Sequence, residues 1–391
     1  MSAGVSSRAL QAQALPAWRR AVLKVGSSLL AADGGGLTTR YAQALAGFIA
    51  ASRAAGRQVV LVSSGAVAAG RALLRQHVPA GGDLAARQAL AALGQAPMIA
   101  LWQSLSPGPV AQVLLTHDDL RNRRRYLNAR ATLRELLALD VLPVVNENDT
   151  VAVDELKLGD NDNLAAIVAA LVDADVLLIA SDIDALYSAD PRRDPLATPI
   201  ANVETLTADV LAMAGGSGSA VGTGGMRTKL EAAIKAAAAG IPTALFSGRE
   251  AATVDALAQG VLRGTLVAAG RSRMQARKYW LRHAPAAGGC IRVDAGAVRA
   301  LAGGRASLLP GGMVEIHGDF HRGDLVEIVD VDGMPVARGL CQYGAGEARR
   351  LVGRHSREIE QALGYSYGAE VVHRDDLVTL GDSETAGEVN A

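Results

Sequence analysis

The chain has 391 residues, of which half are apolar and one fifth are charged. This composition predicts a globular protein with sizeable buried cores, and the length favours about two domains. Lys and Arg together number 39, as do Asp and Glu, so no overall charge attracts nucleic acid or an anionic membrane. Two cysteines are too few for a disulfide scaffold or a zinc site, which fits a reducing cytosol.

Neither a signal peptide nor a membrane span is predicted. The first 20 residues have no apolar run before Arg19 and Arg20, and no segment reaches the ~18 apolar residues needed to cross a bilayer. We therefore expect a cytoplasmic protein with no membrane partner and with a disordered leader over residues 1–20.

Apolar strands and amphipathic helices alternate through the first 240 residues. The strands are predicted at 21–25, 58–62, 111–115, 141–145 and 175–180, and the helices at 38–55, 84–104, 164–172 and 226–239. Gly56 is expected to end the first helix, and Asp162 or Asn163 to cap the third. This alternation predicts an α/β fold with a mostly parallel sheet sandwiched by helices.

Polar residues interrupt or end the first two strands. Lys24 interrupts the first strand, where a lysine is unfavourable unless its ammonium meets an anion or snorkels from an edge strand. The second strand ends at Ser63, Ser64 and Gly65. Small residues at the carboxyl end of a parallel strand let a ligand approach the backbone, although a simple turn has the same composition.

The densest basic run of the chain is Arg121-Asn-Arg-Arg-Arg125. Such a run can bind phosphate or an acidic substrate, but a solvated helix face or a subunit contact is the better interpretation. We therefore place these arginines outside the candidate site.

The stretch from Asn146 to Asn163 is dense in carboxylates and Asn amides and lies between a buried strand and a helix. In a parallel α/β sheet, ligands bind where strands end and helices begin. A solvated acidic loop with ordinary helix caps is the alternative. The strand at 175–180 likewise ends in polar residues, Ser181 and Asp182, which favours a ligand site along this edge of the sheet.

Residues 215–229 form a glycine-rich loop and the start of a helix that carries Lys229. Backbone amides at a helix N-terminus can bind an anion, and the ammonium of Lys229 adds a positive charge. The loop has neither the Walker Gly-Lys-Ser/Thr nor a Gly-x-Gly-x-x-Gly dinucleotide fingerprint. A nucleotide phosphate is the expected ligand, and a flexible surface loop is the alternative.

The composition changes after residue 270, where basic residues, Pro and Gly are followed by short alternating runs separated by turn signals. These runs predict a small β-rich barrel, with Cys290 and Cys341 as core thiols. The predicted divisions are a leader at 1–20, a first domain at 21–270, a linker at 271–288, the β-rich domain at 289–374 and a frayed acidic tail at 375–391.

Two lysines with carboxylates and amides between them suit phosphoryl transfer from a nucleotide, because the transferred group needs positive charge and alignment more than covalent chemistry. No histidine or cysteine occurs in these motifs. A hydroxyl acceptor usually requires a base, whereas a carboxylate acceptor is already ionised near neutral pH. An acyl phosphate is therefore the expected product.

The sequence resembles the glutamate 5-kinase family, a branch of the amino acid kinases that carries a C-terminal PUA domain. The resemblance extends from Val22 to about Leu377. Its motifs are residues 23–28 (LKVGSS), 62–70 (VSSGAVAAG), 144–149 (VVNEND), 159–163 (GDNDN), 222–229 (GTGGMRTK) and 363–368 (LGYSYG). Six motifs matched in the same order identify the family far more specifically than a match to any one of these motifs. One departure is Ser181, where relatives have Thr before the Asp.

The resemblance implies ATP-dependent phosphorylation of the γ-carboxylate of L-glutamate, the first step of proline biosynthesis. It implies that Lys24 and Lys229 stabilise the transferred phosphoryl group and that Asp162 holds them in place. Glutamate would be bound by Ser64, Asp149 and Asn161. The nucleotide would be bound by Lys24, Ser181, Asp182, Thr223, Gly224, Gly225, Met226, Arg227, Thr228 and Lys229. No protein metal ligand is expected, since Mg²⁺ would be held largely by the nucleotide and water. The resemblance also implies a homo-oligomer that proline inhibits at a site overlapping the glutamate site.

Two alternatives remain. Aspartate or N-acetylglutamate kinases share the fold but are not expected to carry a PUA domain. An RNA-binding protein acting through the PUA-like domain is a different class, but residues 289–372 hold nine Arg and no Lys against eleven Asp and Glu. The net charge of these residues is therefore negative, which opposes binding to phosphates, so an RNA partner is not expected.

Overall fold

The computed structural model describes residues 10–32, 35–74, 84–152, 161–214, 225–270, 272–283, 286, 288–303 and 306–380. They form two compact units, the first made mainly of residues up to 273 and the second mainly of residues from 274. In these described ranges, no helix combines the length and the apolar character that a membrane span requires.

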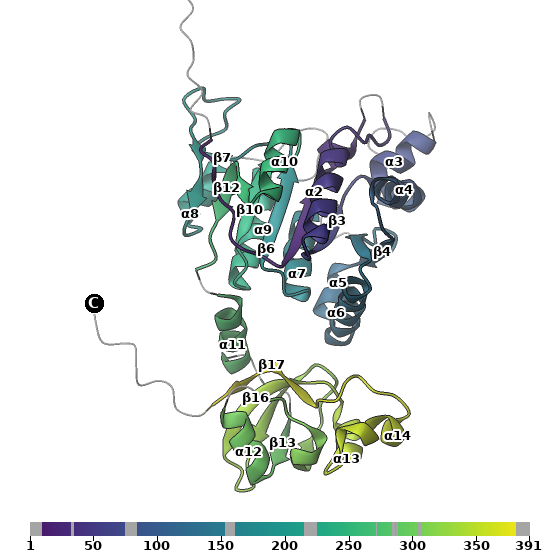
Figure 1. Cartoon of the computed structure of the whole chain (residues 1–391), viewed down its shortest axis with the longest axis vertical. Coiled ribbons are helices and arrows are strands. Elements are labelled where there is room, and N and C mark those ends of the chain that lie inside the picture. Colours follow the sequence, from purple (N-terminus) through teal and green to yellow (C-terminus); the bar gives the residue numbers. More distant parts are fainter. Residues whose placement is uncertain are drawn as a thin grey trace, which may run out of the picture. The chain divides into compact units, whose positions relative to one another are not determined.

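The first unit is built on an eight-stranded sheet in the order β4-β5-β3-β2-β6-β10-β12-β9 (Figure 1). The strands are β2 (Arg20–Val25), β3 (Gln58–Ser63), β4 (Val110–Leu115), β5 (Leu142–Glu147), β6 (Val176–Ser181), β9 (Asn202–Val203), β10 (Thr243–Ser247) and β12 (Gly264–Val267). All neighbouring strands are parallel except β10 and β12. The mostly parallel sheet predicted from the sequence is confirmed.

Helices cover both faces of this sheet, α2 and α10 on one face and α7 and α9 on the other (Figure 1). The helices are α1 (Ser27–Leu30), α2 (Ala42–Ala54), α3 (Ala66–Leu73), α4 (Leu84–Leu105), α5 (His117–Arg121), α6 (Arg123–Ala138), α7 (Asn161–Leu171), α8 (Ala208–Met213), α9 (Met226–Ala238) and α10 (Ala251–Ala258). Successive residues of a strand point to opposite faces. Leu23 therefore joins the core beneath α2, while Lys24 faces α7 and α9.

The expectation of a disordered leader over residues 1–20 is wrong for residues 10–20, while residues 1–9 lie outside the described part. Strand β1 (Gln13–Ala14) pairs with β11 (Val261–Leu262). Leu15 and Trp18 are buried in the core of the first unit, and the Trp18 ring packs near Phe48. Burial of these two apolar side chains stabilises an ordered segment, although the first 20 residues contain no apolar run. A second small ladder joins β7 (Leu186–Tyr187) to β8 (Pro199–Ile200).

The arginines between residues 121 and 134 are only partly exposed to solvent. Arg121, Arg124 and Arg125 are exposed, but Arg130 is buried and pairs with Asp173 at 2.9 Å. Thus these three arginines of the basic run are exposed, whereas Arg130, later in α6, makes a structural ion pair.

The second unit contains a five-stranded sheet in the order β14-β13-β15-β16-β17. Its elements are β13 (Gly289–Val293), α12 (Ala295–Ala302), η1 (Pro310–Gly312), β14 (Met313–Gly318), β15 (Leu325–Val329), β16 (Pro335–Cys341), α13 (Ala345–Leu351), η2 (Ser356–Glu358), α14 (Ile359–Leu363) and β17 (Val372–Thr379). Cys341 is a buried core thiol, as predicted, and burial raises its pKa to about 12. Cys290 is only partly buried, contrary to expectation.

Two expectations about the edges of this unit require correction. Most of the predicted linker is a helix, α11 (Arg273–His283), whose Leu281 is buried with Leu325 and Leu340. The predicted frayed tail is ordered up to residue 380, because β17 continues to Thr379 and the buried Asp376 pairs with Arg277 of α11. The expectation for residues 381–391 lies outside the described residues.

Candidate active site

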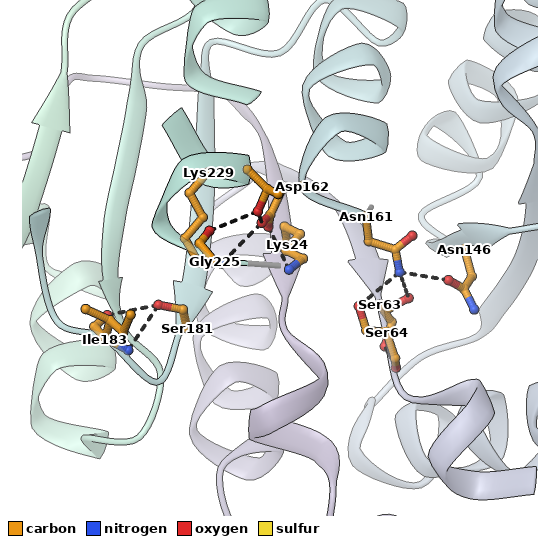
Figure 2. A network of polar contacts seen from close by, with 11 residues as sticks. Lys24, Ser63, Ser64, Asn146, Asn161, Asp162, Ser181, Ile183, Gly225 and Lys229 are labelled. Atoms are coloured by element: carbon orange, nitrogen blue, oxygen red, sulfur yellow. Dashed lines mark hydrogen bonds and ion pairs between the residues drawn. The ribbon is translucent and has the colours of Figure 1, made fainter. Parts of the chain in front are cut away.

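Two buried lysines share one buried carboxylate at the carboxyl edge of the parallel sheet. The Nζ atom of Lys24, on β2, lies 2.7 Å from Oδ1 of Asp162, and Nζ of Lys229, on α9, lies 3.2 Å from Oδ2. All three residues are at most 6% exposed. Figure 2 shows both lysines converging on Asp162 from different elements. Because two ammonium groups share one carboxylate, the three side chains together carry one positive charge.

The lysine charges dominate the state of Asp162. Burial alone would raise the pKa of this carboxyl, but the ammonium groups of Lys24 and Lys229, with hydrogen bonds from Lys24 and Thr228, hold it far below its usual range. The sequence prediction that Asp162 or Asn163 caps the helix is wrong. Helix α7 begins at Asn161, so Asp162 lies in its first turn and its carboxylate bonds to other elements.

Helix α9 supplies a second anion-binding feature beside the lysines. It begins at Met226, after the extended residue Gly225, and carries Lys229 in its first turn. The first amides of a helix have no partner within the helix, so these amides and the helix dipole at this end of a thirteen-residue helix favour an anion. The positive end of α9 and the ammonium groups of Lys24 and Lys229 therefore lie at one edge of the sheet.

Asn161, next to Asp162, makes a separate buried network. Its Nδ2 atom donates to the backbone oxygen of Ser63 at 3.1 Å, to Oγ of Ser64 at 2.9 Å and to Oδ1 of Asn146 at 3.0 Å (Figure 2). A backbone carbonyl can only accept, so the amide nitrogen must face Ser63. The opposite atom, Oδ1, is buried and has no hydrogen-bond partner among the described residues. Such an atom fits a ligand that brings a donor.

Asp149 is buried beyond the end of β5, in the loop that precedes α7. Burial raises the pKa of its carboxyl to about 6, although the nearby charge of Arg87 and a backbone hydrogen bond lower it. Arg87 lies in the first turn of α4, and the next residue, Gln88, donates to the backbone oxygen of Ala152 at 3.1 Å. A partly buried carboxyl with a raised pKa is favourably placed for a ligand ammonium, which would restore its charge.

Replacing Asp149 with Asn should stabilise the unliganded protein at pH 8 and not at pH 4. A carboxyl whose folded pKa is raised stabilises the fold while protonated, and that stability is lost as the pH rises from about 4 to 6. The difference in unfolding free energy between variant and wild type should therefore grow to about 3 kcal/mol above pH 6. Thermal unfolding of both proteins from pH 4 to 8 measures it. A difference that does not change with pH would contradict the buried, ionisable state of Asp149.

The remaining residues expected to bind nucleotide are not all brought together. Oγ of Ser181 donates to the Ile183 oxygen at 2.9 Å and accepts from the Ile183 nitrogen, so this hydroxyl closes a local turn (Figure 2). Asp182 is exposed, 3.8 Å from Arg249. The Arg227 guanidinium pairs with Glu231 on the exposed side of α9. Thr223 and Gly224 lie outside the described residues. Of the residues expected to bind nucleotide, Gly225, Met226 and Lys229 therefore lie together at the start of α9.

Thr228 faces Asp162, a contact that the sequence did not suggest. Its hydroxyl lies 2.7 Å from Oδ2 of Asp162 and 2.9 Å from the Gly225 oxygen. Thr228→Val removes this donor at similar volume, so kcat should fall about 10-fold, since a hydrogen bond to a charged group is lost. Thr228→Ser should retain kcat. Steady-state kinetics with varied ATP, the nucleotide that the resemblance implies, distinguish the alternative, because a hydroxyl that contacts nucleotide would raise the KM for ATP and leave kcat unchanged.

The comparisons identify both domains. Residues 19–247 match the amino acid kinase family and residues 289–363 match the PUA domain. A glutamate 5-kinase of Xanthomonas axonopodis pv. citri (strain 306) is 69% identical over 363 residues, which are 92% of this chain and 100% of that protein. The chain belongs to the glutamate 5-kinase family. A family member from Xylella fastidiosa (strain M12) is 66% identical over 372 residues, covering 94% of this chain and 97% of that protein.

Among solved structures, a UMP kinase from Bacillus anthracis aligns with 65% of this chain and 97% of its own, at 15% identity and a TM-score of 0.45. The family assignment rests on the domain matches and the full-length relatives. It confirms the predicted fold class, an α/β amino acid kinase domain followed by a β-rich PUA domain.

Proposed function

We propose that the protein transfers the γ-phosphoryl group of ATP to the γ-carboxylate of L-glutamate, forming glutamyl 5-phosphate in the first step of proline biosynthesis. The buried cluster of Lys24, Asp162 and Lys229 beside the N-terminus of α9 is the observation that carries the proposal. Identity of 69% to a glutamate 5-kinase across both domains supports the same substrate.

The lysines supply the electrostatic part of the reaction. Charge spread over the oxygens of the transferred group would be stabilised by the ammonium groups of Lys24 and Lys229 in a buried site where water screens them weakly. Asp162 keeps both lysines at defined positions before the nucleotide arrives. The γ-carboxylate is already ionised at neutral pH, so the step requires no general base.

Asn161 and Asp162 are adjacent in α7 and face the two proposed substrate sites, Asn161 the glutamate site and Asp162 the lysines that would hold the phosphates. Asp162 bonds to the lysines, while Asn161 bonds to Ser63 and Ser64 at the end of β3. The α-ammonium of glutamate would donate to Oδ1 of Asn161 and to the carboxylate of Asp149. Ser64 would bind the same α-amino and α-carboxylate end of the substrate. The first turn of α7 would thereby align the glutamate carboxylate with the phosphoryl group.

Magnesium is expected to arrive with ATP. No group of three or more His, Cys, Asp or Glu side chains that could hold a metal occurs in the described ranges. A Mg²⁺ ion held largely by phosphates and water, as its hard, hydrated character favours, would neutralise phosphate charge. Lys24, Lys229 and the amides of α9 would hold the phosphates themselves.

Feedback inhibition by proline would act at the same site. Proline keeps the α-amino and α-carboxylate groups of glutamate, so it should compete with glutamate as a feedback inhibitor at Asp149 and Asn161. Inhibition that added glutamate does not relieve would point to a separate regulatory site. From the family resemblance we further infer a cytoplasmic homo-oligomer. Its PUA domain should not bind RNA, because acidic residues outnumber basic ones in that domain.

A hydroxylamine trap for acyl phosphates tests the proposed reaction. With ATP and Mg²⁺, hydroxamate should form rapidly from glutamate and slowly or not at all from aspartate, N-acetylglutamate or bicarbonate. Preference for one of the other acceptors would overturn the proposed substrate. Omitting ATP from the glutamate reaction controls for hydroxamate that forms without phosphoryl transfer.

A further inference from the structure

A buried tryptophan on α4 bonds to the end of β3, next to the proposed glutamate site. The indole nitrogen of Trp102 donates to Oγ of Ser63 at 2.8 Å, and the two residues are 1% and 0% exposed. Ser63 is the last residue of β3 and immediately precedes Ser64. Trp102 therefore reaches a backbone segment that the substrate is proposed to contact.

The hydrogen-bond directions around Ser63 follow from the donor groups. An indole nitrogen can only donate, so Oγ of Ser63 must accept from Trp102. The single hydroxyl hydrogen of Ser63 is then directed to the Ser64 oxygen, 3.1 Å away. Without the indole N–H, this hydroxyl could rotate to other acceptors.

Asn161 holds the same dipeptide from the opposite side. Its amide bonds to the Ser63 oxygen and to Oγ of Ser64, which leaves its own Oδ1 without a partner in the described part of the chain. The orientation of Ser63 and Ser64 thus also determines the direction of the buried Asn161 oxygen. Trp102 and Asn161 together hold the turn between β3 and α3 in place through these hydrogen bonds.

We propose that Trp102 is a positioning residue, which fixes Ser63 and through it presents Ser64 and Asn161 to the amino acid substrate. The inference rests on the proposed function, since it requires that Ser64 and Asn161 bind glutamate. It adds a residue from α4, 39 positions away from Ser63, to the substrate side of the site.

The position of α4 is fixed independently of this hydrogen bond. Helices α3 and α4 cross at Gly70 and Gly94, where a Cβ atom on Gly94 would lie 1.7 Å from the Ala66 oxygen. This close crossing should keep α4 in place when only the indole N–H is lost. Trp102→Phe is therefore a suitable variant, because it keeps an aromatic side chain in the core.

The test is a double-mutant cycle in the full-length protein, with Trp102→Phe, Ser63→Ala and the double variant. Loss of a neutral hydrogen bond should raise the KM for glutamate about 3- to 10-fold in each single variant. The KM for ATP and kcat should stay within about twofold. The double variant should be no worse than the poorer single variant, because both changes remove the same bond.

Several outcomes would overturn the inference. Multiplicative effects in the double variant, or equal changes in the KM values for glutamate and ATP, would mean that Trp102 acts only through core packing. If Trp102→Phe lowers Tm strongly, Ser63→Ala, which keeps the indole, must alone raise the KM for glutamate. If the wild type phosphorylates glutamate but the variants keep its KM, only the positioning role fails. A wild type inactive on glutamate removes the proposed function and this inference together.

Discussion

Lys229→Met is expected to lower kcat by about 10³-fold while the KM for glutamate changes little. The substitution keeps the unbranched apolar stem and removes the ammonium that lies 3.2 Å from Asp162. That charge is proposed to act on the transferred phosphoryl group, and removing one preorganised charge or donor typically costs 10²- to 10³-fold or more in kcat. Steady-state kinetics with ATP and glutamate varied separately provide the measurement.

Lys235→Met is the matched control, because Lys235 lies on the same helix but is exposed. It should change kcat by less than about twofold, since an exposed charge distant from the phosphates is screened by water. A Lys229 variant that keeps kcat and raises only the KM for ATP would show that this lysine binds the nucleotide without stabilising the transition state.

Asp162→Asn is expected to affect both activity and stability. The variant keeps the shape of the side chain but leaves the ammonium groups of Lys24 and Lys229 close together without their shared carboxylate. Removing one partner of a buried ion pair typically costs 3–5 kcal/mol, so the free energy of unfolding should fall by about 3 kcal/mol. Displacement of the lysines should also lower kcat by at least about 10²-fold.

The pH dependence of the unfolding free energy identifies the cause of the lost stability. A depressed folded pKa stabilises the protein above the unfolded pKa of about 4, and that stability is lost only as the pH falls further. The difference in unfolding free energy between Asp162→Asn and wild type should hence stay constant from pH 5 to 8, whereas the difference for Asp149→Asn changes with pH. Adding Lys24→Met should restore part of the stability. Glu231→Gln, which removes an exposed pair with Arg227, is the control and should change stability by less than about 1 kcal/mol.

The two lysines of the cluster could be predicted from the sequence because each occurs in an unusual local context. Lys24 interrupts an apolar strand, and Lys229 follows a glycine-rich loop at a helix start. The contacts of Asp162 could not be predicted in this way. An Asp near a helix start fits an ordinary N-cap equally well, and only the tertiary fold shows that it meets Lys24 from β2.

Two side chains that contact the site through hydrogen bonds from distant elements were also missed. Asn146 was noted only as part of an acidic stretch, and Trp102 only as part of a helix, since neither has a local sequence signal. Their partners are brought together by the order of β3, β5 and α7 in the fold. The same limit explains the errors for residues 10–20 and 273–283, where the buried side chains of Leu15, Trp18 and Leu281 order segments that have no continuous apolar run.

Transfer of ¹⁸O from glutamate to phosphate tests the central claim most directly. Glutamate labelled at both γ-carboxylate oxygens is incubated with ATP, Mg²⁺, hydroxylamine and the full-length protein, and the inorganic phosphate is examined by mass spectrometry. If the γ-carboxylate attacks the phosphoryl group, hydroxylamine then displaces phosphate that keeps one glutamate oxygen, so each phosphate should carry one ¹⁸O atom. Release of unlabelled phosphate, from attack by water on ATP, would contradict a carboxylate acceptor at the Lys24, Asp162 and Lys229 cluster.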